Sequence, residues 1–257
     1  MATRISYKNI NRLESLKNSK KPGLGNLLKV LHLLGEPQFK LGKTIIISGT
    51  NGKGTVANIL NRIYVDSGYK VGLYTSPHLV SLNERIRIRD KKIDSRILDS
   101  YLNKVIKAGL RINCKLSFFE LLTATTILYF AQKKNDLNIF EVGLGGRFDA
   151  TNVIKSKIGI ITNIEMDHME YLGNSLREIA YEKIGIINNN SKLITSVKSS
   201  LMQTIKKYCL KNGTEIFKLN SDFNTFKENE YYIYESPKFN LKFKSQLDAS
   251  HQVQNLG

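Results

Sequence analysis

Short apolar runs alternate with amphipathic segments along most of this chain. Runs rich in isoleucine, leucine and valine, which are typical of buried strands, occupy residues 44–48, 70–76, 137–143, 158–164, 192–197 and 214–219. Between them, apolar residues recur at helical spacing, which predicts helices over 24–37, 56–67, 95–109, 117–134, 175–187 and 201–213. This alternation predicts an α/β fold with a doubly wound, mostly parallel sheet.

Several helix ends and faces can be predicted individually. Gly68 closes the helix that follows the first strand. Ser117 precedes Glu120 by three residues, and Ser175 precedes Glu178 in the same way, which is typical of a capping box at a helix N-terminus. In the helix that ends before Gly68, the spacing predicts an inward face formed by Val56, Ile59, Leu60 and Ile63.

Two regions interrupt the alternation. Residues 76–94, "SPHLVSLNERIRIRDKKID", are interpreted as an excursion between regular elements. From Tyr231 onward, "YYIYES" and "KFNLKF" are separated only by Pro237. These two runs predict a small antiparallel β hairpin near the C-terminus, at the edge of the sheet or in a small β subdomain.

Composition narrows the possible partners. The 257 residues include 39 Lys+Arg and 22 Asp+Glu, which gives a net charge of +17. The basic residues are scattered rather than interleaved with aromatic ones, so we favour small anionic ligands over nucleic acid. Cys114 and Cys209 are too far apart to suggest a disulfide framework or a zinc site, and both are expected to pack as small hydrophobic residues. No stretch is long and apolar enough to suggest a leader or a membrane span, so we expect a cytoplasmic protein with no membrane partner.

A glycine-rich loop joins the first strand to its helix. Backbone N–H groups in such a loop, at the positive end of a helix dipole, are suited to bind phosphate. Lys53 would neutralise the β- and γ-phosphates, and the Thr55 hydroxyl would reach Mg²⁺. Gly54 separates these two residues, unlike in the standard P-loop, and an ordinary tight turn is the alternative. The predicted ATP-binding loop comprises Gly49, Thr50, Asn51, Gly52, Lys53, Gly54 and Thr55.

Six sequence blocks, of which the phosphate loop is the first, occur in a characteristic order along the chain. They read "GTNGKGT", "GLYTSPHLVSLNERI", "FEVGLGGRFDATN", "TNIEMDHMEYLG", "IAYEKIGII" and "HQVQN". Across residues 22–257 the chain resembles the folylpolyglutamate and dihydrofolate synthases of the Mur ligase superfamily. The resemblance implies a sheet of the P-loop NTPase type, as in the central domain of Mur ligases. It also implies an ATP-dependent ligase that adds L-glutamate to dihydropteroate, to the γ-carboxyl of folate, or to both, through an acyl phosphate.

The resemblance also implies a domain organisation. Residues 1–40 would form an N-terminal segment, 41–248 the ATP-binding domain, and 249–257 the start of a linker to a C-terminal domain that the family carries. In that family the reaction occurs in a cleft between the two domains. We therefore expect residues 1–257 alone to bind nucleotide as a monomer but not to complete glutamate ligation.

Candidate metal ligands lie near the predicted strand ends. Glu141 is expected at the carboxyl end of a buried strand, beside the phosphate loop, where a carboxylate would need a cation. From the residues alone, His168 could be structural, Ser76 could be a turn residue, and Lys183 could extend to the surface. The resemblance instead makes Lys183 a carbamylated lysine and implies two Mg²⁺ ions held by Thr55, Ser76, Glu141, His168 and Lys183. It assigns catalysis to Lys53, Glu141, His168 and Lys183.

The remaining site residues follow from the resemblance alone. It adds Asn255 to the ATP-binding set. It places a pterin-bearing substrate against Leu24, Gly25, Ser117, Phe118, Phe119, Glu120, Phe148, Asp149 and Ala150. Core packing is the alternative explanation for the phenylalanines.

Three other functions share the phosphate loop. They are a Mur-type ligase acting on peptidoglycan precursors, a nucleotide-dependent kinase, and a non-catalytic or incomplete Mg-ATP-binding fragment. The blocks "SPHL" and "GGRFDATN" favour the folate branch through the resemblance.

Overall fold

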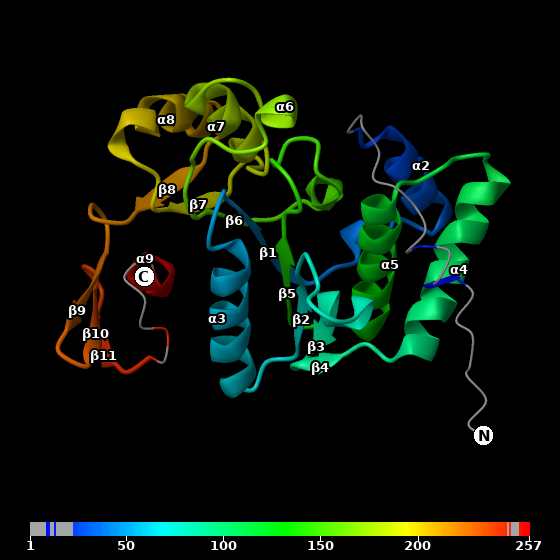
Figure 1. Ribbon diagram of the computed structural model, residues 1–257, viewed down its shortest axis with the longest axis horizontal. Coiled ribbons are helices and arrows are strands. Elements are labelled where there is room, and N and C mark those ends of the chain that lie inside the picture. The colour runs from blue at the N-terminus through cyan, green and yellow to red at the C-terminus, as the bar shows by residue number, and fades with distance from the viewer. Residues whose placement is uncertain (1–8, 11–12, 14–22, 246, 248–251) are drawn as a thin grey trace.

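The computed structural model describes residues 9–10, 13, 23–245, 247 and 252–257. An eight-stranded sheet runs through its centre in the order β4-β3-β2-β5-β1-β6-β7-β8 (Figure 1). The strands are β1 Lys43–Ser48, β2 Val71–Tyr74, β3 Ile86–Ile88, β4 Lys91–Lys92, β5 Leu137–Glu141, β6 Ile158–Ile161, β7 Lys192–Thr195 and β8 Glu215–Lys218. The predicted α/β class and mostly parallel sheet are confirmed.

The central strands bring their carboxyl ends to one edge of the sheet. β1 lies between β5 and β6, and all three run parallel. Ile47 is opposite Glu141, and Ser48 is opposite Ile161. The segments that follow these strands therefore emerge side by side, which is where open α/β sheets bind ligands.

Helices cover both faces of this sheet. Ile45 and Ile47 of β1 point to the face covered by α3 (Lys53–Asp66), and Ile46 points to the opposite face, which holds the larger hydrophobic core. This difference follows from the alternation of side chains along a strand. The helices that contribute to the larger core are α2 Gly25–Leu33, α4 Ser95–Arg111, α5 Phe118–Lys133, α7 Leu176–Ile184 and α8 Met202–Lys211.

The predicted capping boxes are present at α5 and α7. The Ser117 hydroxyl accepts a hydrogen bond from the Glu120 N–H, and the Ser117 N–H donates to the Glu120 carboxylate. Ser175 and Glu178 make the same pair of bonds. α5 is buried on all sides, since ten consecutive residues, 121–130, are buried.

The excursion over 76–94 contains regular structure that the sequence did not reveal. A 3-10 helix (Leu82–Arg85) leads into β3 and β4, which extend the sheet beyond β2 in antiparallel fashion. β3 and β4 have only three and two residues, too few for the periodicity of a strand to be recognised.

The predicted inward face of α3 is partly wrong. Ala57 and Asn61 are the buried residues of α3, whereas Ile63 is 54% exposed. Val56 and Leu60 pack against the core under the sheet, as predicted, whereas Ile59 and Ile63 line an apolar cavity of about 470 Å³. The helical period was therefore predicted correctly, and the predicted inward face holds for two of its four residues.

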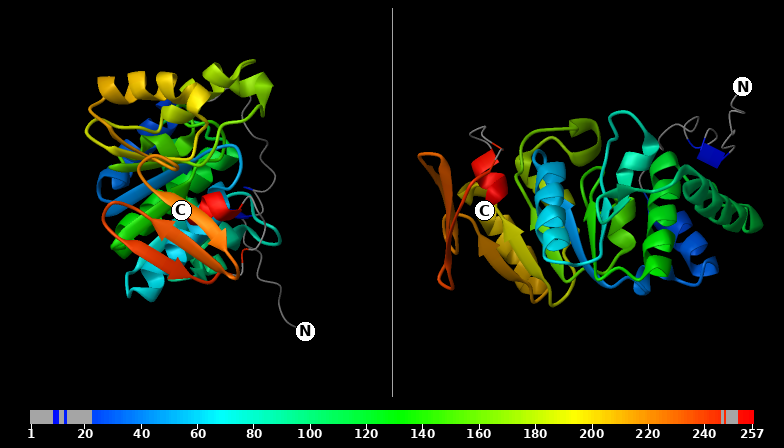
Figure 2. Two further views of the ribbon diagram at one scale, coloured as in Figure 1. Left: turned by 90° about the vertical axis from the view of Figure 1, so that its left-hand side faces the viewer. Right: turned by 90° about the horizontal axis from the view of Figure 1, so that it is seen from below.

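A second, antiparallel sheet closes this cavity. It consists of β9 (Asn224–Glu228), β10 (Tyr231–Glu235) and β11 (Asn240–Phe243), and it lies beside the short helix α9 (Gln252–Leu256) (Figure 2). The predicted hairpin is β10–β11. β9 was missed because its residues are mostly exposed and polar.

The remaining sequence predictions have mixed outcomes. Of the predicted linker, residues 249–251 lie outside the described residues. Cys209 is buried, whereas the thiol of the partly exposed Cys114 donates to Asn26 Oδ1 at 3.5 Å, so only Cys209 is fully packed. Within the described ranges, no helix has the length and apolar character needed to cross a membrane.

Candidate active site

The loop between β1 and α3 is held by the segment that follows β6. Asn163 Oδ1 accepts hydrogen bonds from the Thr50 N–H at 3.2 Å and from the Asn51 N–H at 2.8 Å. The Thr162 hydroxyl donates to the Asn51 carbonyl at 2.6 Å. Gly52 caps α3, so the first amides of α3 face the loop as a phosphate site requires.

Two loop glycines have no room for a side chain. Gly49 has a φ of +148°, and a Cβ there would lie 1.9 Å from Thr162 Oγ1. Gly52 has a φ of +81°, and a Cβ there would lie 2.4 Å from Asn255 Oδ1. Asn255 of α9 therefore lies directly against the loop, consistent with its predicted place in the ATP-binding set.

Two lysines converge on one backbone oxygen of this loop. Lys53 Nζ donates to the carbonyls of Gly49 and Thr50, each at 3.0 Å, and Lys183 Nζ donates to the Gly49 carbonyl at 2.8 Å. Lys183 is only 2% exposed. Burial lowers its pKa to about 8, and the neighbouring Lys53 cation acts in the same direction. The loop thus presents two adjacent ammonium groups where polyphosphate would lie.

Glu141 lies at the carboxyl end of β5, beside the loop. Its side chain is 4% exposed, and Oε2 accepts a hydrogen bond from the Ser76 N–H at 2.9 Å. A Cβ at Gly54 would lie 3.4 Å from Oε1, so the glycine lets the loop approach the carboxylate. Burial raises the pKa of Glu141, partly offset by the Ser76 hydrogen bond and the Lys53 charge.

The residues around Glu141 fit a magnesium ion. Within the described part of the chain, Oε1 of Glu141 accepts no hydrogen bond. Ser76 lies beside this carboxylate, and Thr55 directly follows Gly54, whose Cβ position is 3.4 Å from Oε1. Both side chains carry hydroxyl oxygens, the ligand type that Mg²⁺ prefers. His168 lines the neighbouring cavity and lies beside Asp167, with 3.6 Å between Nε2 and Oδ1. No group of three or more His, Cys, Asp or Glu side chains that could hold a metal occurs among the described residues.

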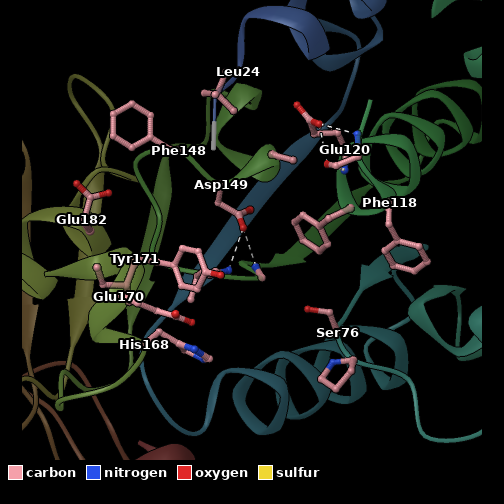
Figure 3. A pocket seen from close by; sticks show the side chains of 18 of the residues that line it. Leu24, Ser76, Phe118, Glu120, Phe148, Asp149, His168, Glu170, Tyr171 and Glu182 are labelled. Atoms are coloured by element: carbon pink, nitrogen blue, oxygen red, sulfur yellow. Dashed lines mark hydrogen bonds between the residues drawn. The ribbon is translucent and has the colours of Figure 1, made fainter. Parts of the chain in front are cut away.

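A large cavity of about 760 Å³ adjoins this cluster (Figure 3). In Figure 3, Phe118 and Ser76 lie on one side of the cavity, and Phe148, Tyr171 and His168 lie on the other. All the predicted substrate residues line it except Gly25, which instead begins α2. The described lining comprises Gly23, Leu24, Ser76, Pro77, Arg85, Ser117, Phe118, Phe119, Glu120, Gly143, Leu144, Phe148, Asp149, Ala150, His168, Glu170, Tyr171, Leu172 and Glu182.

Residues 47–257 match the Mur ligase middle domain family. This chain therefore belongs to the Mur ligases.

Individual proteins and solved structures that resemble this chain narrow the comparison within the Mur ligases. The dihydrofolate synthase/folylpolyglutamate synthase of Bacillus subtilis is 34% identical over 253 residues, which are 93% of this chain and 58% of that protein. A structure described as an FPGS-AMPPCP-folate complex matches with a TM-score of 0.92 and 29% identity, over 98% of this chain and 65% of that one. Escherichia coli FolC in complex with DHPP and ADP matches with a TM-score of 0.88 and 28% identity, over 96% of this chain and 59% of that one. This chain thus spans about three fifths of the length of these relatives.

Two carboxylates in the cavity of this Mur ligase domain differ in how many hydrogen bonds they already accept. Asp149 Oδ2 accepts from the N–H groups of Gly143 and Leu144, each at 3.0 Å. Its Oδ1 accepts from the N–H and hydroxyl of Thr151, at 2.9 and 2.6 Å. Glu120 uses only Oε2, for Ser117. Asp149 therefore shapes its loop, and Glu120 has the freer oxygen for a ligand.

Gly146 and Arg147, in the loop after β5, pack against α7, the helix that carries Lys183. The Arg147 guanidinium stacks 3.9 Å above the Tyr181 ring, and its Nε lies 3.8 Å from Glu182 Oε1. A Cβ at Gly146 would lie 2.7 Å from the Lys183 carbonyl oxygen. This close packing of loop on helix holds Lys183 at a set distance from the phosphate loop.

Sequence reasoning missed several residues of the site. Asn163 could have been found, because it is a polar residue near the carboxyl end of a predicted buried strand, and that end reaches the same edge of the sheet as the loop. Tyr171 lay within a recognised block without being singled out. Arg85 also lay within a recognised block, "GLYTSPHLVSLNERI", but its place in the cavity depends on the short β3–β4 excursion, which the sequence did not reveal.

Proposed function

We propose that this chain forms the Mg-ATP-binding and acceptor-binding part of an ATP-dependent amide ligase. The whole ligase would add L-glutamate to dihydropteroate, to the γ-carboxyl of folate, or to both. The observation that carries this proposal is the junction at Ser76, which lines the cavity and also donates through its N–H to Glu141, beside the phosphate loop. A γ-phosphate on the loop and a carboxylate in the cavity would therefore meet.

The cavity suits a flat, partly aromatic acceptor. Phe118, Phe119, Phe148 and Tyr171 line it, and its volume is within the range of small-molecule sites. The names of the relatives support the same assignment: they are folate ligases, and two of the structures carry nucleotides together with folate or DHPP.

The proposed reaction has two steps. A carboxylate oxygen of the acceptor attacks the γ-phosphorus of ATP, and the bond to ADP breaks, which gives an acyl phosphate. The neutral amine of glutamate then attacks the acyl carbon, the bond from that carbon to the phosphate oxygen breaks, and the amide forms as inorganic phosphate leaves and the nitrogen loses one proton. Lys53 and the loop amides would hold the phosphates in place, and no protein nucleophile is required. Magnesium held by Glu141, Ser76 and Thr55, with His168 beside it, would supply charge neutralisation.

Lys183 fits conversion to a carbamate. Two ammonium groups on one carbonyl oxygen repel each other, and a pKa of about 8 leaves a substantial neutral fraction of the amine. The neutral nitrogen can add to the carbon of CO₂ and lose a proton to solvent. The resulting anion would attract Lys53 and could provide oxygen ligands for a second Mg²⁺.

Nucleotide binding provides the direct test. Lys53→Ala should weaken Mg-ATP binding about tenfold or more in calorimetry, because it removes a charge-assisted contact to phosphate. Lys157→Ala is the matched control, because Lys157 also donates to two backbone carbonyls, at 3.3 and 3.4 Å, but away from the loop. Equal Mg-ATP affinity in wild type and Lys53→Ala, or no binding in either, would contradict the proposal.

A second assay tests the acceptor. Dihydropteroate should bind the purified chain and change its intrinsic tyrosine emission. The whole ligase should incorporate labelled glutamate and release phosphate only when both substrates are present. Phosphate transfer that is independent of glutamate and yields a stable phosphorylated product would instead indicate a kinase.

A further inference from the structure

Arg85 is a buried cation in the cavity to which neither the sequence nor the reaction assigns a role. It ends the 3-10 helix Leu82–Arg85, is 9% exposed, and lines the cavity together with Ser76 and Phe118. Among the described lining residues it is the only arginine or lysine. The ionisable carboxylates around the same cavity are Glu120, Asp149, Glu170 and Glu182.

The Arg85 guanidinium lacks an anionic partner. Its Nε donates to His78 Nδ1 at 2.8 Å, and its central carbon lies 5.2 Å from the centroid of the Phe118 ring. Within the described part of the chain, its two terminal NH₂ groups make no hydrogen bond and no ion pair. Burial is the main influence on the pKa of Arg85 and lowers it, and Glu141 only partly offsets that effect.

The half-buried Arg147 has an anionic partner in Glu182, and Arg87 donates to the neutral side chain of Asn58. Lys53 and Lys183, which donate only to backbone carbonyls, lie at the proposed phosphate site. Burial of the rest of the Arg85 side chain makes an unpaired charge costly, and the unpaired NH₂ groups remain accessible from the cavity, which indicates a site for an anionic ligand.

We propose that Arg85 binds the carboxylate of the acceptor through its two terminal NH₂ groups. The planar fork of a guanidinium matches a carboxylate in a two-bond geometry, and Phe118 beneath it offers a ring face to an aromatic carboxylate. This inference rests on the proposed function, because it places the benzoate end of a pterin-bearing acceptor near Ser76.

The position also has a chemical consequence for the reaction. The negative charge of Glu141 repels any second carboxylate that approaches the γ-phosphate. The positive charge of Arg85 is close enough to interact electrostatically with Glu141. A guanidinium there offsets the repulsion and holds the attacking oxygen in place. The His78 bond to Nε fixes the rotation of the fork.

A purely structural role for Arg85 would be to support Phe118 and His78. The two roles differ in one measurable respect, because only a carboxylate-binding residue distinguishes an acid from its neutral amide. We therefore compare two ligands of the same shape, pteroic acid and its carboxamide.

Each ligand is titrated into the full chain, and its binding is measured by calorimetry. Wild type should bind pteroic acid on the order of 10- to 100-fold more tightly than the carboxamide. Arg85→Met should bind both ligands equally, at the level of the carboxamide. The matched control is Arg87→Met, which removes a half-buried arginine two residues away that points to Asn58 and should keep the wild-type preference. Mg-ATP binding and the melting temperature show whether each variant is folded.

The outcomes separate this inference from the proposed function. If Arg85→Met binds Mg-ATP and still prefers the acid, Arg85 is structural and the inference is overturned, while the acceptor site stands. If wild type binds neither ligand, both the acceptor assignment and the inference fail. If Arg85→Met does not fold, Arg85→Lys decides: a reduced preference for the acid supports the inference, and an unchanged preference overturns it.

Discussion

The packing of Gly146 against α7 makes a quantitative prediction for Gly146→Ala. The added Cβ would lie 2.7 Å from the carbonyl oxygen of Lys183, 2.8 Å from that of Glu182 and 2.9 Å from a methyl group of Ile186. The two oxygens are backbone atoms. The Glu182 oxygen also accepts hydrogen bonds from the N–H groups of Arg147, at 2.8 Å, and of Gly185, at 3.2 Å, so it cannot rotate away.

The helix end must therefore move to admit the methyl group. Overpacking of this kind costs about 1–3 kcal/mol. A loss of about 2 kcal/mol in a domain of this size lowers the melting temperature by about 4–8 °C. The same movement displaces Lys183 Nζ from the Gly49 carbonyl, so Mg-ATP affinity should fall as well.

Urea unfolding and calorimetry with Mg-ATP test both parts. Gly25→Ala serves as the control, because nothing lies within 4 Å of a Cβ at Gly25 and this first residue of α2 has no left-handed conformation. It should leave the free energy of unfolding unchanged or raise it by up to about 1 kcal/mol. A free energy of unfolding for Gly146→Ala within about 0.5 kcal/mol of wild type would refute this account of the glycine.

Two further predictions concern the charged groups of the site. Glu141→Gln keeps an oxygen for the Ser76 N–H but removes the carboxylate, so Mg²⁺ should no longer strengthen ATP binding in calorimetry; retained Mg²⁺ dependence would place the metal elsewhere. Because folding lowers the pKa of Lys183 from 10.5 to about 8, the unfolded chain holds this proton more tightly between those values. In urea titrations the free energy of unfolding of wild type, relative to Lys183→Met, should therefore rise as pH increases from about 8 towards 10.5. With ¹³C-bicarbonate, a carbamate signal that depends on Lys183 should grow over the same rise in pH; its absence would exclude the carbamate.

The sequence predicts the active edge of the sheet well, for a physical reason. Strands of buried type that alternate with helices run parallel, and their carboxyl ends then share one edge. The loop after β1, Glu141 at the end of β5 and the segment after β6 are therefore brought together by topology alone. Lys183 was also predictable, because its helical spacing from Ile179 placed it on a buried face.

Other features depend on tertiary context that no local pattern carries. Ile63 has the spacing of a core residue, yet α3 turns its side chain toward the cavity beside the second sheet. β3 gains its strand character from pairing with β2, and β4 from pairing with β3. Arg85 lies in an ordinary polar stretch, and only the path of the chain from the 3-10 helix into β3 brings it to the cavity wall.

The two-residue strand β4 also bears on how copies of this protein behave in solution. An open parallel sheet ends in a row of unpaired N–H and C=O groups, which can template the addition of a strand from another molecule. Here that side of the sheet ends in Lys91 and Lys92, both exposed, on a strand too short to offer more than a few hydrogen bonds. Lys92 also forms an ion pair with Glu84, at 3.1 Å. An incoming strand would have to displace that pair and approach two ammonium groups, so this edge resists intermolecular sheet extension and the aggregation that follows from it.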